Sequence, residues 1–328
     1  MSYIIGVDIG GTTMKSGLFE AEDPKAPLYT WSIPTDTEDG GARILTDAAE
    51  ACLRELARIQ VPIGEIQAAG IGVPGPVTGG AVVHGCPNLG WGTVDVSRDF
   101  ASLTGIPRVE TQNDANCAAL GELLYGAGQG ADSCAMVVLG TGVGCGVVLD
   151  GKILTGRFGA AGEIGHLPMK TDETAYCGCG KKGCLEQYAS ATGLVREARQ
   201  RLDSRLDLRA GGPSVLRSIH LFTAKDVMDA ARSGDPLALS AVRTGAEMLG
   251  RGLAMVACTA DPGLFILGGG LAQGGSFYLD LVRASYRAHC YPPSQEAEFR
   301  LAALGPQAGL IGAAALQRTR PASEPPSL

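Results

Sequence analysis

Residues 3–19 read YIIGVDIGGTTMKSGLF: two runs of apolar, largely β-branched residues on either side of a glycine- and threonine-rich turn. Residues 135–150, AMVVLGTGVGCGVVLD, repeat this order of strand, turn and strand. Such patterns predict hairpins with glycine-rich tips. The backbone N–H groups of a tip can converge on phosphate oxygens, and threonine hydroxyls add further donors. Two such hairpins in one chain predict a duplicated fold with two phosphate-binding turns.

The two turns provide the candidates for nucleotide binding. Asp8 ends the first strand, where its carboxylate is placed to hold Mg²⁺ through water. The other candidates are turn residues and one lysine: Gly10, Gly11, Thr12, Thr13, Lys15, Gly140, Thr141, Gly142 and, after a later strand, Gly269. Either turn alone also fits a plain hairpin, and neither matches a Walker or dinucleotide-binding pattern. The pairing of the two turns carries this prediction.

A loop in the middle of the chain, CGCGKKGC (residues 177–184), contains three cysteines, and His166 lies eleven positions before it. Three thiolates and one imidazole form a full tetrahedral set for zinc, on a loop too short and glycine-rich to bury an apolar core. We predict that His166, Cys177, Cys179 and Cys184 bind a structural Zn²⁺ with no open position for substrate. The alternatives are ordinary buried thiols or a disulfide, although a Cys177–Cys179 bridge would close a very small ring.

Composition limits the possible functions of the 328-residue chain. It is 45% hydrophobic and 19% charged, with a net charge of −7 spread without long runs of one sign. This balance disfavours nucleic acid and acidic membranes as partners. The N-terminus has no leader-like segment, and the ten cysteines fit a reducing compartment, so we expect a cytoplasmic protein.

Apolar periodicity predicts the elements. After the first hairpin we expect strands at 28–34, 66–73, 82–83, 108–111, 264–267 and 297–303, and helices at 41–60, 114–126, 190–203, 224–232, 235–260, 278–290 and 307–318. We expect a small lobe of residues 1–115 with a C-terminal helix at about 305–318, and a large lobe of residues 116–304 that holds the zinc loop. Residues 319–328 are expected to be a disordered tail.

Seven motifs stand in order along the chain: DIGGTTMK (8–15), GVPGP (72–76), NLGW (88–91), NDAN (113–116), GTGVG (140–144), EIGH (163–166) and the run from Cys177 to Glu186. Together they resemble the ROK family (repressor, open reading frame, kinase) of sugar kinases, over residues 3 to about 318. Within it, CLEQYASAT (184–192) is most similar to bacterial ATP-dependent glucokinases. The resemblance implies an α/β protein with the actin-like ATPase (ribonuclease-H-like) fold, two lobes around a central cleft.

The implied activity is ATP-dependent phosphorylation of glucose to glucose 6-phosphate. Asp114 opens a helix directly after a strand, where the helix dipole keeps it ionised, and the resemblance gives it the role of general base. A helix cap is the plainer role, and Asn113 can fill that role as well.

Sugar hydroxyls require short polar groups, because a buried polar group left unpaired penalises the wrong epimer. The candidates are Gly75, in a stiff Pro-Gly-Pro turn, with Asn88, Asn113, Asp114, Glu163, His166 and Glu186. We expect His166 to use one ring nitrogen for zinc and the other for the sugar. Taken alone, Asn88 is more often a turn residue.

Other functions remain to be weighed. ROK repressors carry a helix-turn-helix ahead of this lobe pair, and a first strand at Tyr3 leaves no room for one. A sugar-binding protein without kinase activity would leave Asp8, Asp114 and both turns without a role. Other ROK kinases act on N-acetylmannosamine, N-acetylglucosamine, fructose or allose. The sequence leaves open the epimer, ATP or polyphosphate as donor, and assembly as a homodimer or homotetramer. Cys145 stands where the family commonly has glycine.

Overall fold

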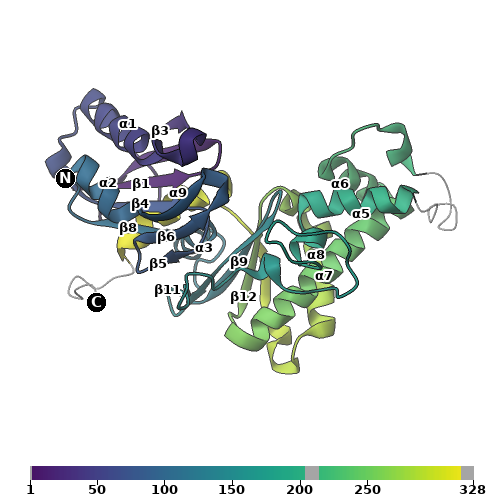
Figure 1. Ribbon diagram of the computed structural model, residues 1–328. Helices are drawn as coiled ribbons and strands as arrows, with labels where there is room; N and C mark the ends of the chain where they lie inside the picture. Colours follow the sequence, from purple (N-terminus) through teal and green to yellow (C-terminus); the bar gives the residue numbers. More distant parts are fainter. Residues whose placement is uncertain (1, 204–213, 319–328) are drawn as a thin grey trace. The chain divides into compact units, whose positions relative to one another are not determined.

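The computed structural model describes residues 2–203 and 214–318. Within these ranges the chain forms two compact units (Figure 1). The first comprises residues 2–132, 146–162 and 306–318, and the second comprises residues 133–145, 163–203 and 214–305. Helix α3 (Asp114–Tyr125) therefore packs within the first unit, whereas we expected the small lobe to end at residue 115. The expected tail, residues 319–328, lies outside the described residues.

The first sheet has the strand order β3-β2-β1-β4-β8. The strands β1 (Tyr3–Ile9), β2 (Thr13–Glu20) and β3 (Tyr29–Pro34) are antiparallel neighbours, which confirms the predicted hairpin and third strand. The strands β4 (Ile66–Val73) and β8 (Val109–Asn113) then add in parallel. Asp8 pairs with Lys15 on one side and with Gly72 on the other, so the hairpin tip lies at the carboxyl ends of β1, β4 and β8.

Four helices belong to the first unit: α1 (Ile44–Arg58), α2 (Val96–Thr104), α3, and α9 (Ala308–Ala315). The unit also contains a small antiparallel sheet, which is formed by β5 (Val77–Thr78), β6 (Val82–Cys86) and β7 (Trp91–Asp95). Sequence analysis missed β5, β7 and α2. Only Val96 and Phe100 mark the buried apolar face of α2, which is too short a signal for periodicity to detect.

The second five-stranded sheet has the order β11-β10-β9-β12-β13. It consists of β9 (Cys134–Leu139), β10 (Val143–Leu149), β11 (Lys152–Ile153), β12 (Leu264–Gly268) and β13 (Glu298–Leu301). The strand β12 runs parallel to β9, and β13 runs parallel to β12, so this sheet repeats the arrangement of the first. The predicted duplication is therefore confirmed in the strand order.

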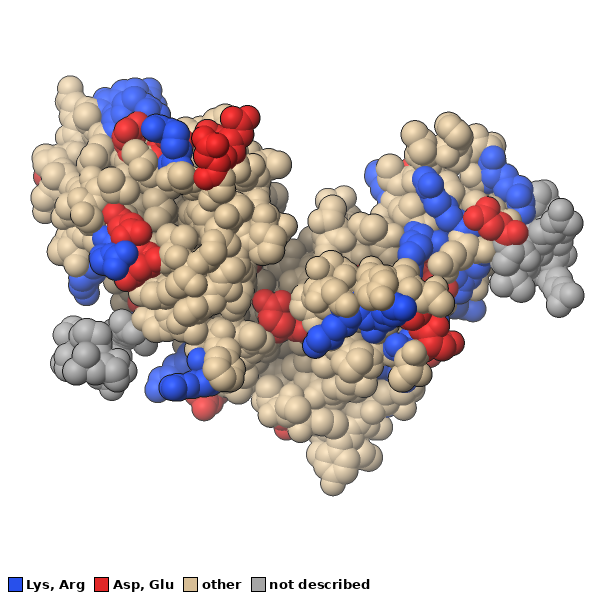
Figure 2. All heavy atoms as spheres, viewed as in Figure 1, with Lys and Arg blue, Asp and Glu red and all other residues tan. Residues whose placement is uncertain are grey.

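The helices of the second unit are α4 (Glu186–Ala189), α5 (Ala191–Asp203), α6 (Ala224–Arg232), α7 (Pro236–Ala260) and α8 (Gly275–His289). Sequence signals define the start of α7: Asp235 accepts a hydrogen bond from the Ala238 N–H, and Pro236 follows at the first helical position. Among the described residues, no helix has both the length and the apolar character needed to cross a membrane. Basic and acidic side chains lie close to one another on the face shown in Figure 2.

Glycines let α9 approach its neighbours backbone to backbone. A Cβ atom on Gly70 of β4 would overlap the Ala313 carbonyl, and one on Gly312 would overlap the Cys117 carbonyl of α3. A Cβ atom on Gly121 of α3 would lie 2.5 Å from the Ala308 oxygen. The helix α9 thus lies so close to α3 and to the first sheet that no side chain fits between their backbones at these points.

We expect Gly70→Ala to destabilise the protein by more than about 3 kcal/mol, because the methyl group must push α9 away from β4. Gly64→Ala is the matched control, since a Cβ atom there meets nothing within 4 Å. Thermal and urea unfolding would measure both variants. Equal stability of the two would contradict the close packing.

Candidate active site

The tip of the first hairpin is braced by β3. The Gly10 N–H donates to the Thr13 carbonyl at 3.0 Å, and the Thr35 hydroxyl donates to the Gly10 carbonyl at 2.7 Å. The Thr35 N–H donates to the Thr12 carbonyl at 3.0 Å. Gly11, Thr12 and Thr13 remain exposed at the tip. The turn is therefore rigid while its outer residues face solvent, as an anion-binding turn requires.

The carboxylate of Asp8 lies below this tip, beside the start of α9. A Cβ atom on Gly309 would be 3.3 Å from Asp8 Oδ2. Burial raises the pKa of Asp8, and the neighbouring Lys15 ammonium opposes that rise. A cation at this carboxylate would stabilise its ionised form. Asp8 therefore fits a place beside nucleotide-bound Mg²⁺.

The junction of β8 and α3 carries the predicted base. The Asn113 carboxamide oxygen accepts hydrogen bonds from the N–H groups of Ala115 at 3.0 Å and Asn116 at 3.2 Å, which caps α3. Its Nδ2 donates to the Gly75 carbonyl at 3.2 Å. Asp114 is exposed at the first position of the helix, with its Oδ1 accepting from the Ala115 N–H at 2.8 Å. Asn113 thus links the helix to the Pro-Gly-Pro turn and retains one N–H for a ligand.

Two buried amides below this junction were missed by sequence reasoning. The Gln112 Oε1 accepts from the Asn113 backbone N–H at 3.0 Å and from Asn116 Nδ2 at 3.3 Å. Gln112 is 5% exposed and Asn116 is 2% exposed. The available signal was a glutamine near the end of a strand, four positions before an asparagine in the first turn of the following helix. These amides fix the backbone that carries Asn113 and Asp114.

Asn88 also lies in the first unit, in the turn Pro87–Leu89 between β6 and β7. It is exposed, and a Cβ atom on Gly11 would lie 3.6 Å from its carbonyl oxygen. This unit therefore holds the first glycine turn, Asp8, Gly75, Asn88, Asn113 and Asp114.

The second glycine turn belongs to the second unit and is braced in a similar way. The Gly140 N–H donates to the Gly142 carbonyl at 3.0 Å, and the Ala191 N–H at the start of α5 donates to the Gly140 carbonyl at 2.8 Å. Gly269 packs against the Leu139 backbone with a φ of +84°, a conformation that requires glycine. Thr141 is exposed at the tip. Cys145 is an ordinary buried residue of β10.

The predicted metal ligands converge. One ligand atom each from His166, Cys177, Cys179 and Cys184 lies within 4.8 Å of the others. Cys179 Sγ and Cys184 Sγ are 3.6 Å apart, and Cys177 Sγ is 3.7 Å from His166 Nδ1. A tetrahedral zinc with Zn–S bonds of about 2.3 Å has ligand–ligand edges of about 3.8 Å. These spacings fit a tetrahedral metal ion.

The loop geometry and thiol chemistry agree with this fit. The Cys177 N–H donates to the Lys181 carbonyl at 2.7 Å, and the Gly180 N–H donates to the Cys177 carbonyl at 2.9 Å, so the loop folds back on itself. Burial raises the pKa of Cys184 to about 12 and also raises that of Cys177. The Lys181 backbone N–H lowers the pKa of Cys179. Thiolates at the two buried positions require a nearby cation.

Glu186, which begins α4, connects the metal loop to the second glycine turn. Its Oε2 accepts the Val143 N–H at 3.0 Å, and its Oε1 lies 3.7 Å from Cys177 Sγ. The carboxylate also fills the space that a side chain at Gly142 would need. Glu163 is exposed one residue before the 3₁₀ turn Ile164–His166, and its carbonyl accepts the His166 N–H at 3.1 Å. The second unit therefore gathers Glu163, His166 and Glu186 around the metal loop.

A second carboxylate, also missed from sequence, anchors this loop. Glu173 Oε2 accepts the Tyr188 hydroxyl at 2.7 Å and an Arg196 N–H at 2.9 Å. Burial alone would raise the pKa of Glu173, but the Ala175 N–H, Tyr188 and Arg196 lower it to about 2. The ionised carboxylate ties the segment between His166 and Cys177 to α4 and α5.

Comparison with known proteins agrees with this arrangement. The ROK family model matches residues 4–320, and the chain belongs to the ROK family. It is 39% identical to a glucokinase of Halalkalibacterium halodurans (94% of this chain, 93% of the relative) and 38% identical to a glucokinase of Streptomyces coelicolor (97% and 98%). A ROK glucokinase structure from Streptomyces griseus, in complex with glucose and AMPPNP, aligns with a TM-score of 0.75 at 36% identity, covering 97% of this chain and 100% of that one. The actin-like ATPase fold is confirmed.

We expect the purified protein to contain about one zinc ion per chain. Cys179→Ala should abolish metal binding, lower the melting temperature, and weaken sugar binding more than ATP binding, because it displaces His166, Glu163 and Glu186 together. Cys258→Ala, on the exposed side of α7, is the control and should retain the metal. Metal analysis by mass spectrometry checks this. A fully active preparation without zinc would refute the structural role.

Proposed function

We propose that the protein transfers the γ-phosphoryl group of ATP to glucose, forming glucose 6-phosphate and ADP. The reaction type rests chiefly on one observation: an exposed aspartate, Asp114, is fixed at the N-terminus of α3 by a capped strand–helix junction. Glucose as the acceptor rests on the glucokinases that match nearly the whole chain.

Asp114 acts as the general base. Its Oδ1 accepts the Ala115 N–H at 2.8 Å, which orients the carboxylate that would take the proton of the attacking sugar hydroxyl. The hydroxyl loses this proton as the new P–O bond forms and the bond to ADP breaks, so a strongly basic carboxylate is not needed. The N-terminal end of α3 favours the ionised aspartate before the transfer.

The two glycine turns bind the nucleotide. Gly10, Gly11, Thr12, Thr13 and Lys15 in one turn, and Gly140, Thr141, Gly142 and Gly269 in the other, would donate to phosphate and ribose oxygens. Mg²⁺ would neutralise phosphate charge, with Asp8 as its nearest carboxylate. Because both turns are braced by the rest of the fold, little ordering accompanies binding.

Each unit carries polar groups that we propose for sugar binding. Asn88, the remaining N–H of Asn113, and the backbone around Gly75 are offered by the first unit, and Glu163, His166 and Glu186 by the second. Each hydroxyl that finds a partner contributes affinity, and each missing hydroxyl leaves a polar group unpaired. This arrangement provides epimer discrimination.

The metal in this proposal is a structural Zn²⁺. His166 Nδ1 faces the cysteine cluster, which leaves Nε2 for a sugar hydroxyl and fixes the ring tautomer. With four protein ligands the metal has no vacant position for substrate. Its contribution is to hold the loop that carries the sugar ligands.

Other ROK substrates are the alternative: N-acetylmannosamine, N-acetylglucosamine, fructose or allose, with polyphosphate as a possible donor in place of ATP. We place the protein in the cytoplasm, because ATP is available there and none of the ten cysteines forms a disulfide. Participation in glycolysis follows from the proposed product. Assembly as a homodimer or homotetramer stays a prediction.

Asp114→Asn should lower kcat by at least ~10²-fold with little change in sugar affinity, because a general base contributes about 10²–10⁴-fold. Asp47→Asn, in the first turn of α1, is the control for removing an aspartate near a helix start. Steady-state kinetics and sugar calorimetry separate the two effects. Activity of the Asp114 variant within a few-fold of wild type would rule out this base.

Thr141→Ala should raise the KM for ATP more than that for glucose, because the hydroxyl stands at the exposed tip of the second turn. Thr259→Ala, an exposed threonine of α7, is the matched control. Gly11→Val should also weaken ATP binding, although its side chain would contact the Asn88 carbonyl as well. A change in glucose KM alone in the Thr141 variant would place that turn at the sugar instead.

A further inference from the structure

The turn that carries Asn88 is anchored on both sides of that residue. Cys86 and Trp91 pair across the hairpin, and the Gly90 N–H donates to the Pro87 carbonyl at 3.1 Å. Leu89 is fully buried and Trp91 is 7% exposed. Asn88 is therefore exposed, while the neighbouring Leu89 and Trp91 anchor its turn in the protein interior.

The turn packs against the segment Asp39–Gly41, whose backbone is in the left-handed conformation. Its φ angles are +48°, +70° and +67°, a run that only glycine adopts without strain and that includes one aspartate. A Cβ atom on Gly90 would lie 2.8 Å from the Gly40 Cα, and one on Gly41 would overlap the Leu89 carbonyl. The two segments thus touch backbone to backbone.

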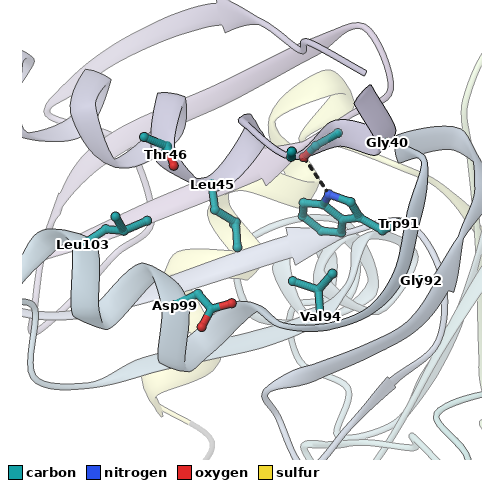
Figure 3. Close-up of a pocket in the computed structure, with 10 residues that line it drawn as sticks. Gly40, Leu45, Thr46, Trp91, Gly92, Val94, Asp99 and Leu103 are labelled. Atoms are coloured by element: carbon teal, nitrogen blue, oxygen red, sulfur yellow. Dashed lines mark hydrogen bonds between the residues drawn. The ribbon is translucent and has the colours of Figure 1, made fainter. Parts of the chain in front are cut away.

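A single side-chain hydrogen bond joins them. Trp91 Nε1–H donates to the Gly41 carbonyl at 3.0 Å (Figure 3). Beside the indole lies a pocket of about 280 Å³, which Leu45, Val94 and Leu103 also line. The ring belongs to the hydrophobic core, but the open space leaves one side of it without packing contacts. The bond to Gly41 therefore adds a directional restraint on the indole and, through it, on residues 87–90.

We propose that Trp91 is a positioning residue for the sugar, which acts through the Asp39–Gly41 segment to hold Asn88 in place. The proposal deepens the sugar-kinase function and rests on it. Trp91 itself does not touch the substrate. The Asn88 carbonyl lies next to Gly11, so the same turn also borders the first phosphate-binding tip.

Trp91→Phe tests this, because it keeps an aromatic ring and removes only the N–H donor and part of the ring. The chain offers a matched control in Trp31→Phe. Trp31 is the other of its two tryptophans, and its buried Nε1 has no hydrogen-bond partner in the described structure. Loss of a donor that has no partner should not weaken the protein.

Two measurements on the full-length protein decide the outcome. Hydrogen–deuterium exchange should be faster at residues 87–91 in Trp91→Phe and unchanged in Trp31→Phe. The KM for glucose should rise roughly five- to tenfold in Trp91→Phe, as expected for one lost buried hydrogen bond, with smaller changes in ATP KM and kcat. Asn88→Ala should show the same pattern of kinetic change.

Unchanged exchange at residues 87–91 in Trp91→Phe would overturn the positioning role of the Trp91–Gly41 bond, whatever the substrate. Faster exchange with an unchanged glucose KM would also overturn the proposal, while leaving the kinase function intact. If the wild-type protein phosphorylated no hexose, the proposed function would fail, and the sugar-positioning role would fail with it. In that case the exchange data would still report whether the Trp91–Gly41 bond holds the turn.

Discussion

Contacts between backbone segments, with no side chain between them, are the constraint on which this structure depends. They place α9 on the first sheet at Gly70 and on α3 at Gly312, and the Asn88 turn on Asp39–Gly41 at Gly90. They also place Gly269 on the end of β9, beside the second glycine turn. Such contacts leave no rotamer freedom, so each fixes the separation of the two backbone segments that it joins. The 48 glycines of the chain are explained in large part by these contacts and by turns with positive φ.

The metal loop obeys a different constraint. It has little apolar surface of its own, so its shape depends on the His166–cysteine cluster, on Glu173 and on Glu186. Glu186 contacts both Cys177 and the Val143 N–H. A displacement of the metal ligands would therefore move the second glycine turn through this one side chain. Under the proposed function, specificity for the sugar and placement of the nucleotide would therefore share one carboxylate.

Sequence reasoning found what is local and missed what joins distant segments. The two hairpins, the candidate metal ligands and the Asn113 cap could be predicted because each lies within one short stretch of sequence. The Trp91–Gly41 bond joins residues 50 positions apart, and the bond between Tyr188 and Glu173 depends on how the loop folds back. Neither leaves a periodic or spaced signal. The helix α2 was missed because its apolar face is short.

The most direct test of the account is a coupled ADP-release assay with ATP over a panel of glucose, fructose, allose, N-acetylglucosamine and N-acetylmannosamine. The account predicts ADP release that depends on sugar, with the highest kcat/KM for glucose and glucose 6-phosphate as product. ADP release without dependence on any sugar, or a clear preference for an N-acetylhexosamine over glucose, would contradict it.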